Sequence, residues 1–274
     1  MNQVEQFENE VRENITCLSN DINLKNLSLR WLSEITPYKY AYNFRSLGRP
    51  IIQLPQDMIA LQEIIWQVRP DLIVETGIAH GGSLVQSASM LALIDYCEAV
   101  ELSKTLDLKA SRRMVLGIDI DIRAHNRVAI ETHPLAHKIS MIQGSSINPE
   151  MISKVHQYAE DYERILVCLD SNHTHDHVLA EMEAYAPLVS VGSYCVVFDT
   201  LIEDMADDMF PDRPWGKGNN PKTAVWEYLQ RLKDEGRKAK DGKPLKFEYD
   251  RMMEHKLLIT AAPNGYLKRL NTPQ

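Results

Sequence analysis

The chain has 274 residues, of which 44% are hydrophobic and 25% are charged, a composition typical of a water-soluble globular protein. Its formal net charge of −8 argues against a nucleic-acid backbone as the main partner, because no broad basic field is available. The four cysteines show no C-x-x-C spacing, and no apolar run is long enough to span a bilayer. We therefore expect a cytoplasmic protein without a disulfide framework, a zinc site or integral membrane association.

The first 50 residues mix polar, aromatic and amide side chains. They predict an N-terminal extension that is partly helical, with a loop around Tyr38 to Arg49. Pro55 opens a helical pattern that Arg69-Pro70 ends. Residues 51–274 are predicted to form one domain on which the extension packs.

Strands and helices alternate through the rest of the chain. The pattern predicts strands over residues 72–74, 114–118, 139–142, 165–169 and 194–198, and helices over residues 84–93, 149–158, 177–185 and 222–232. Residues 98–113 are interpreted as a polar insertion. A last strand over Lys256 to Ala261 is expected to turn at Pro263-Asn264-Gly265 into Tyr266 to Leu270. The expected fold is an α/β sheet, mostly parallel with a C-terminal antiparallel hairpin, and helices on both faces.

The segment from Asp71 to Ser83 predicts a strand, a glycine-rich turn and a helix, an arrangement that holds nucleotide-like cofactors. Its glycines Gly77, Gly81 and Gly82 fit neither G-x-G-x-x-G nor the phosphate-binding loop G-x-x-x-x-G-K-[ST]. Glu75 at the strand end would repel a pyrophosphate but can accept from an ammonium group. The segment therefore favours S-adenosylmethionine over a dinucleotide.

The next two strand ends also carry polar residues. Asp119 and Asp121 follow the second strand, where a carboxylate can accept two hydrogen bonds from a ribose diol; a helix cap is an equally good interpretation. Gly144, Ser145 and Ser146 follow the third strand and suit the edge of an adenine, although a tight turn explains Ser146 as well.

The fourth strand runs into Asp170-Ser171-Asn172-His173-Thr174-His175-Asp176-His177. Asp170 can bind a divalent cation, and His173 can act as a general base near neutral pH, with His175 second in line. In the alternative, Asn172 or Thr174 caps the next helix and the histidines face solvent, which is the favoured interpretation for His177.

Asp199 ends the fifth strand, with Glu203 and Asp204 close behind it. Asp170 and Asp199 at neighbouring strand ends would repel each other, and a hard cation such as Mg²⁺ between them resolves that repulsion. Pairing of one carboxylate with Lys217 or Arg213 is the alternative.

The segment from Phe210 to Pro221 has no regular period and is rich in Pro, Gly and Asn. A loop of this kind is commonly a lid or binding loop. Arg213, Trp215 and Asn219 would stack on and hydrogen-bond to a sugar-like ring; a surface loop anchored by a buried Trp215 is the alternative. Tyr40, Tyr42, Asn43 and Phe44 are suggested as a further wall of the pocket.

With these residues in place, the chain resembles the cephalosporin hydroxylase family, which has the S-adenosylmethionine-dependent methyltransferase fold and includes rhamnosyl O-methyltransferases. The resemblance covers about Asn43 to Arg269. Its motifs are Arg49-Pro50-Ile51-Ile52-Gln53, the Glu75–Ser83 loop, Leu169-Asp170-Ser171-Asn172-His173, Asp199-Thr200 and Arg213-Pro214-Trp215-Gly216.

The resemblance implies a Rossmann-like class I methyltransferase sheet, with residues 51–274 as the catalytic domain. It implies that Glu75, Gly77 and Ser83 hold the methionine part of the cofactor, Asp119 the ribose and Gly144 to Ser146 the adenine. Asp170 and Asp199 correspond to Mg²⁺ ligands. The residue before the second aspartate is often acidic in metal-dependent members, whereas here it is Phe198. Glu203 or Asp204 would then substitute, or the site carries no metal.

The expected function is S-adenosylmethionine-dependent O-methyl transfer to a hydroxyl of a small-molecule or glycosyl acceptor, with or without Mg²⁺. A hydroxylase or oxidoreductase component is the alternative, but the chain has no redox-metal or flavin signature. A non-catalytic binding partner is a third alternative. The Met- and Tyr-rich N-terminal surface leaves room for a homo-oligomer.

Overall fold

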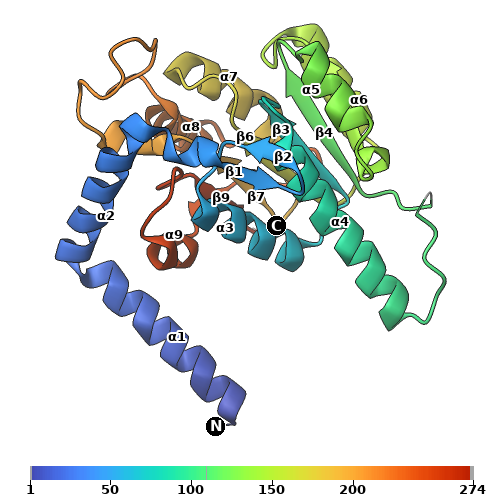
Figure 1. Cartoon of the computed structure of the whole chain (residues 1–274), viewed down its shortest axis with the longest axis horizontal. Coiled ribbons are helices and arrows are strands. Elements are labelled where there is room, and N and C mark those ends of the chain that lie inside the picture. The colour runs from blue at the N-terminus through green and yellow to red at the C-terminus, as the bar shows by residue number, and fades with distance from the viewer. Residues whose placement is uncertain (1, 109, 272–274) are drawn as a thin grey trace.

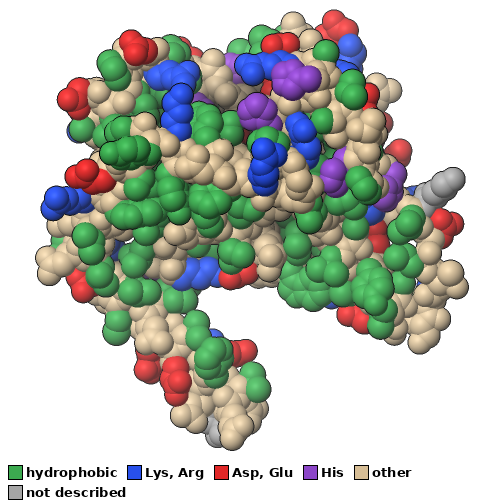
Figure 2. Space-filling model, viewed as in Figure 1, with side chains coloured by type: hydrophobic (Ala, Val, Ile, Leu, Met, Phe, Trp, Pro, Cys, Tyr) green, Lys and Arg blue, Asp and Glu red, His purple; other side chains and the backbone are tan. Residues whose placement is uncertain are grey.

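The N-terminal segment forms two helices and a small hairpin. The computed structural model describes residues 2–108 and 110–271. Helix α1 (Gln3–Asn20) stands away from the body, α2 (Ile22–Ile35) leads back to it, and β1 (Phe44–Ser46) pairs with β2 (Arg49–Ile51) (Figure 1). Strand β2 runs across residue 50, where sequence alone placed the domain boundary. Figure 2 shows hydrophobic side chains exposed on the outstanding end of α1. Val4 and Phe7, near the start of α1, are among the exposed hydrophobic residues.

The centre of the molecule is a seven-stranded sheet with the order β5-β4-β3-β6-β7-β9-β8. The strands are β3 (Leu72–Thr76), β4 (Met114–Asp119), β5 (Ile139–Gln143), β6 (Ile165–Leu169), β7 (Tyr194–Val197), β8 (Phe247–Tyr249) and β9 (Tyr266–Arg269). Strands β3 to β7 are mutually parallel, and β9 pairs antiparallel with both β7 and β8. The predicted mostly parallel sheet with an antiparallel C-terminal hairpin is confirmed.

Helices cover both faces of the sheet (Figure 1). One face carries α3 (Pro55–Val68), α4 (Gly82–Glu101) and α5 (Ala124–Glu131), and the other carries α6 (Pro149–Ala159), α7 (His175–Tyr185) and α8 (Pro221–Glu235). Helix α5 was not expected from the sequence. Helix α4 continues to Glu101, into the segment interpreted as a polar insertion. Within the described residues, no helix is both long enough and apolar enough to cross a membrane.

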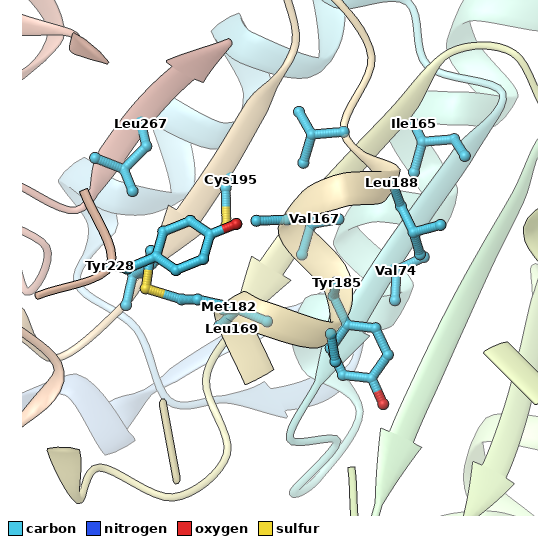
Figure 3. Packing of buried hydrophobic residues seen from close by; sticks show 14 of the residues in the cluster. Val74, Ile165, Val167, Leu169, Met182, Tyr185, Leu188, Cys195, Tyr228 and Leu267 are labelled. Atoms are coloured by element: carbon cyan, nitrogen blue, oxygen red, sulfur yellow. The ribbon is translucent and has the colours of Figure 1, made fainter. Parts of the chain in front are cut away.

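Alternation along the strands produces the two cores. Leu72 and Val74 point into the core beneath α6 to α8, whereas Ile73 between them points into the core beneath α3 to α5. Figure 3 shows Val74, Val167 and Tyr228 in the first of these cores. Burying each such side chain contributes about 1.5–3 kcal/mol, which fixes the register of the strands and therefore the position of their carboxyl ends.

The predicted strand over Lys256 to Ala261 is wrong. Helix α9 (Arg251–Leu257) ends inside that range, and the first strand of the hairpin is β8 instead. A short apolar run such as Leu257 to Ile259 does not distinguish a helix end from a strand. The remaining residues leave the sheet because the buried Asp57 carboxylate accepts hydrogen bonds from the Thr260 hydroxyl and the Ala261 amide.

Candidate active site

A cavity of about 610 Å³ opens beside the ends of β3, β6 and β7. Four parts of the chain supply most of its lining. The first is the glycine loop, residues 77–83; the second is the pair of loops after β6 and β7; the third is residues 50–54, at the end of β2 and directly after it; the fourth is the outer wall, made by α2, residues 36–42 and residues 205–215. Figure 2 shows histidine and basic side chains gathered on the upper part of the molecule. Of the four residues suggested as a further wall, Tyr40 and Tyr42 line the cavity, whereas Asn43 and Phe44 do not.

The glycine loop passes very close to the neighbouring strand end. Gly77 has φ = +89°, and a Cβ atom at this position would lie 1.9 Å from the carbonyl oxygen of Asp170. Asp119 Oδ2 accepts hydrogen bonds from the amides of Ile78 (2.8 Å) and Ala79 (3.2 Å). Only glycine fits at residue 77, and the carboxylate at the end of β4 shapes the loop.

Glu75 lies buried at the end of β3 beneath this loop. The Ser83 hydroxyl, from the first turn of α4, donates a hydrogen bond to its carboxylate. Burial raises the pKa of Glu75 to about 7, because the charged form loses its hydration. Gly81, with φ = +79°, is the N-cap of α4. A buried carboxyl that is hydrogen-bonded to a neutral hydroxyl favours a cationic ligand.

A second group of polar side chains lies where β6 and β7 end. Asp170, His173 and Asp199 each offer a ligand atom, and these atoms all lie within 4.8 Å of one another. His173 Nε2 lies 3.1 Å from Asp199 Oδ2. Burial, and then the charge of Asp199, raise the pKa of Asp170 well above its usual value. We call these three residues the reaction-centre cluster.

The structure does not bring Glu203 into this cluster. Its carboxylate accepts hydrogen bonds from the Gly218 amide (2.8 Å) and the Asn220 side chain, and so fixes the base of the 210–221 loop. Asp204 forms an ion pair with Lys222. Both alternative metal ligands are thus engaged elsewhere, because the short 3-10 helix after Asp199 turns them towards α8.

Two further candidates also point away from the cavity. The His175 ring contacts the Thr223 hydroxyl (2.8 Å) and the Glu227 carboxylate (3.0 Å), so it ties α7 to α8. Asn219 accepts a hydrogen bond from the His175 amide and donates one to the Pro214 carbonyl. Neither side chain lines the cavity.

Arg213 and Trp215 do line the cavity. The Trp215 ring meets the His173 ring edge-on, with centroids 4.8 Å apart, and the Arg213 guanidinium lies 5.2 Å from the centre of the Trp215 ring. Lys217 pairs with Asp207 rather than with a strand-end aspartate. The 210–221 loop therefore reaches the reaction-centre cluster through Trp215.

The residues predicted to hold ribose and adenine lie beyond the cavity wall. Asp121 is exposed, and its amide donates to Asp119 Oδ1. Gly144 has φ = +157°. Ser145 and Ser146 follow the end of β5. The buried Ser146 hydroxyl donates a hydrogen bond to the Glu181 carboxylate. These residues share one edge of the sheet with the glycine loop.

Sequence reasoning assigned no role to Arg49. Its guanidinium donates to the His80 carbonyl (2.7 Å) and to Asn126 Oδ1 (2.9 Å), while the Asn126 amide donates to the Ala79 carbonyl (2.9 Å). The hairpin β1–β2 thus holds the glycine loop from outside. The motif that begins at Arg49 was the available signal.

Comparison with known proteins identifies the family to which the chain is similar. Residues 38–270 match the family described as Rhamnosyl O-methyltransferase/CmcI. The Rhamnosyl O-methyltransferase of Mycobacterium bovis (strain BCG / Pasteur 1173P2) is 30% identical over 78% of this chain and 73% of its own. The enzyme of the same name from Mycobacterium leprae (strain TN) is 27% identical over 81% of this chain and 82% of its own. A solved structure described as "cmcI-D160 Mg-SAM" superposes with a TM-score of 0.52 at 17% identity, covering 84% of this chain and 78% of the other.

Proposed function

This chain belongs to the Rhamnosyl O-methyltransferase/CmcI family, and from that premise we propose that it transfers the methyl group of S-adenosylmethionine to a hydroxyl of a glycosyl or other small-molecule acceptor. The observation that carries the proposal is the position of the reaction-centre cluster. Asp170, His173 and Asp199 line the same cavity as the glycine loop, so a cofactor on that loop directs its methyl group towards a histidine.

The glycine loop receives the methionine end of the cofactor in this proposal. The buried carboxyl of Glu75 lies beneath the cavity lining and binds the α-ammonium, while Gly77 and Ser83 line the cavity and Gly81 caps α4 beside them, so that the ligand can approach the backbone. Asp119 or Asp121 accepts from the ribose. Although Asp119 already accepts three amide hydrogen bonds, a carboxylate has about four acceptor positions, so one remains. Gly144, Ser145 and Ser146 lie along the adenine.

Methyl transfer is an in-line displacement, so the enzyme has to align the acceptor oxygen with the sulfonium methyl and take up a proton. His173 is the proposed base. Asp199, 3.1 Å from its Nε2, orients the imidazole. Trp215 packs against the ring edge and restricts its rotation.

The donor set of the cluster fits a divalent cation. Mg²⁺ commonly takes one or two protein carboxylates, with water or substrate oxygens completing its shell. Asp170 and Asp199 would hold the ion, and the like charges that raise the pKa of Asp170 favour a cation there. Phe198 leaves the site with two carboxylates. A bound ion would lower the pKa of the acceptor hydroxyl.

The acceptor side of the cavity suits a sugar ring. The two relatives from Mycobacterium are named for a rhamnosyl acceptor, and here Trp215 and Arg213 present an aromatic edge and a guanidinium to the space beside His173.

The exposed side chains of Val4 and Phe7 on α1 support association of copies of the chain, which light scattering tests directly.

Calorimetry tests the proposed function. S-adenosylmethionine and S-adenosylhomocysteine are titrated into the protein with and without Mg²⁺, with NAD as the control ligand. Binding of both adenosyl compounds but not NAD supports the proposal and leads to a screen of glycosides as acceptors. Absence of adenosyl binding in both conditions contradicts it.

A further inference from the structure

Gln53 leaves a buried polar atom unpaired. Its side chain is 5% exposed, and its Oε1 atom has no hydrogen-bond partner. Leaving a buried amide oxygen unsatisfied costs about 1–3 kcal/mol, so folded proteins seldom keep one without a reason. The orphaned atom therefore points to a missing donor.

The position of Gln53 indicates where that donor comes from. Several other buried side-chain atoms in the described parts of the chain also lack a partner, but Gln53 is the residue among them that lines the cavity. Gln56 and Gln86 have the same orphaned oxygen and do not line it. A ligand in the cavity can therefore reach the Gln53 carboxamide, whose oxygen turns from its buried position to meet a donor, and cannot reach the other two.

The segment that carries Gln53 lies directly on the glycine loop. A Cβ atom at Gly82 would come within 2.3 Å of the Pro50 carbonyl oxygen, so the end of β2 touches the first turn of α4. Ser83 is the next residue of that turn, and its hydroxyl binds Glu75. Pro50, Gln53 and Ser83 all line the cavity, so the segment that carries Gln53 and the first turn of α4 enclose the space in which the proposed function places the methionine part of the cofactor.

We propose that Gln53 binds the amino-acid end of the cofactor, so that its carboxamide satisfies one of the two charged groups there. A carboxamide offers an acceptor oxygen and two donor hydrogens, while the amino-acid end offers an ammonium and a carboxylate. The two groups are complementary in either orientation of the amide. This inference rests on the proposed function and adds a binding residue outside the glycine loop.

The experiment compares two ligands that differ in this end alone. S-adenosylhomocysteine carries the amino-acid group, and 5′-deoxy-5′-methylthioadenosine lacks it. Kd values for both are measured by calorimetry with the wild-type chain, Gln53→Ala and the matched control Gln56→Ala, after thermal unfolding has shown equal folding. Gln53→Ala is expected to raise the Kd of S-adenosylhomocysteine roughly 10-fold or more, which is the effect of losing a hydrogen bond to a charged group. The Kd of methylthioadenosine is expected to stay the same. Gln56→Ala is expected to change neither.

Three results would overturn the inference. Equal weakening of both ligands by Gln53→Ala would mean that the amide acts on the adenosine part or on folding. No change in either would mean that Gln53 serves the acceptor or no ligand. If the wild-type chain bound neither compound, the proposed function itself would fail, and this inference with it.

Discussion

The inner and outer walls of the cavity are held in place in different ways. The inner wall consists of the glycine loop and the reaction-centre cluster. Hydrogen bonds to the ends of buried strands hold it, such as those that the Ile78 and Ala79 amides donate to Asp119. The outer wall is α2, residues 36–42 and residues 205–215, most of it in short 3-10 turns and loops. The 210–221 loop depends on a few contacts at its base, chiefly those of Glu203.

This difference separates two tasks. A cofactor that is the same in every turnover suits a wall that the sheet has already formed, because little ordering is needed when it binds. An acceptor has to enter and leave, and a loop wall permits that. Changes in the inner wall should therefore affect cofactor binding and chemistry, and changes in the outer wall should affect the acceptor.

Replacement of His173 by Ala is expected to have the largest effect. Loss of the base lowers kcat by roughly 10²–10⁴-fold while the Kd of S-adenosylhomocysteine stays the same. Single-turnover kinetics with labelled S-adenosylmethionine and calorimetry provide the two measurements. His175→Ala is the matched control, since His175 binds Thr223 and Glu227 outside the cavity. An unchanged rate in the His173 variant would show that His173 is not the general base.

Gly77→Ala tests the close approach of the glycine loop to Asp170 in the inner wall. The new methyl group would lie 1.9 Å from the Asp170 carbonyl oxygen at a residue with φ = +89°. The strain should lower the free energy of unfolding by about 2–5 kcal/mol and abolish S-adenosylhomocysteine binding. Gly216→Ala in the 210–221 loop, directly after the outer wall, places a Cβ atom where nothing lies within 4 Å, so this variant should fold and bind the cofactor normally. If the two variants had the same free energy of unfolding and the same affinity for S-adenosylhomocysteine, the proposed difference between the walls would be wrong.

The pH dependence of stability tests Glu75. Its pKa rises from 4.5 to about 7 on folding, so the folded chain holds this proton more tightly than the unfolded chain. The stabilising contribution is full below pH 4.5 and is lost as the pH rises through 7. In urea unfolding, the free energy of unfolding of the wild-type chain should fall by up to about 3 kcal/mol relative to that of Glu75→Gln as the pH rises across this range. Parallel pH profiles for the two chains would contradict a buried, proton-holding Glu75.

Glu203→Ala should give the smallest effect and the one most specific to the outer wall. Loss of the hydrogen bonds to Gly218 and Asn220 loosens the base of the 210–221 loop. KM for the acceptor is expected to rise roughly 10-fold, with S-adenosylhomocysteine affinity unchanged. Glu203→Gln, which keeps an acceptor oxygen, should recover most of the loss. A change in cofactor affinity instead would place Glu203 with the inner wall.

The contrast between the walls also explains what could be predicted from the sequence. Buried strands such as Ile165–Leu169 and the glycine loop follow from local periodicity and from backbone geometry that only glycine permits. The juxtaposition of Asp170 with Asp199 follows because neighbouring parallel strands end at the same edge.

Other features depend on contacts between distant parts of the chain. Glu203 and His175 carry side chains suited to the site, yet each binds a partner at least fifteen residues away. The unpaired oxygen of Gln53 becomes evident only when the surrounding atoms are placed. The course of residues 258–261 is determined by Asp57, about two hundred residues earlier. Such pairings leave no periodic trace in the sequence.

Hydrogen exchange with and without S-adenosylhomocysteine tests the central claim, that the preformed inner wall is the cofactor site. The amides of residues 77–83 should gain the strongest protection, with a smaller gain at residues 144–146 and little at residues 205–215, because the ligand would contact residues 77–83 directly and suppress their local opening. Protection concentrated in residues 205–215, with none at the glycine loop, would contradict the account.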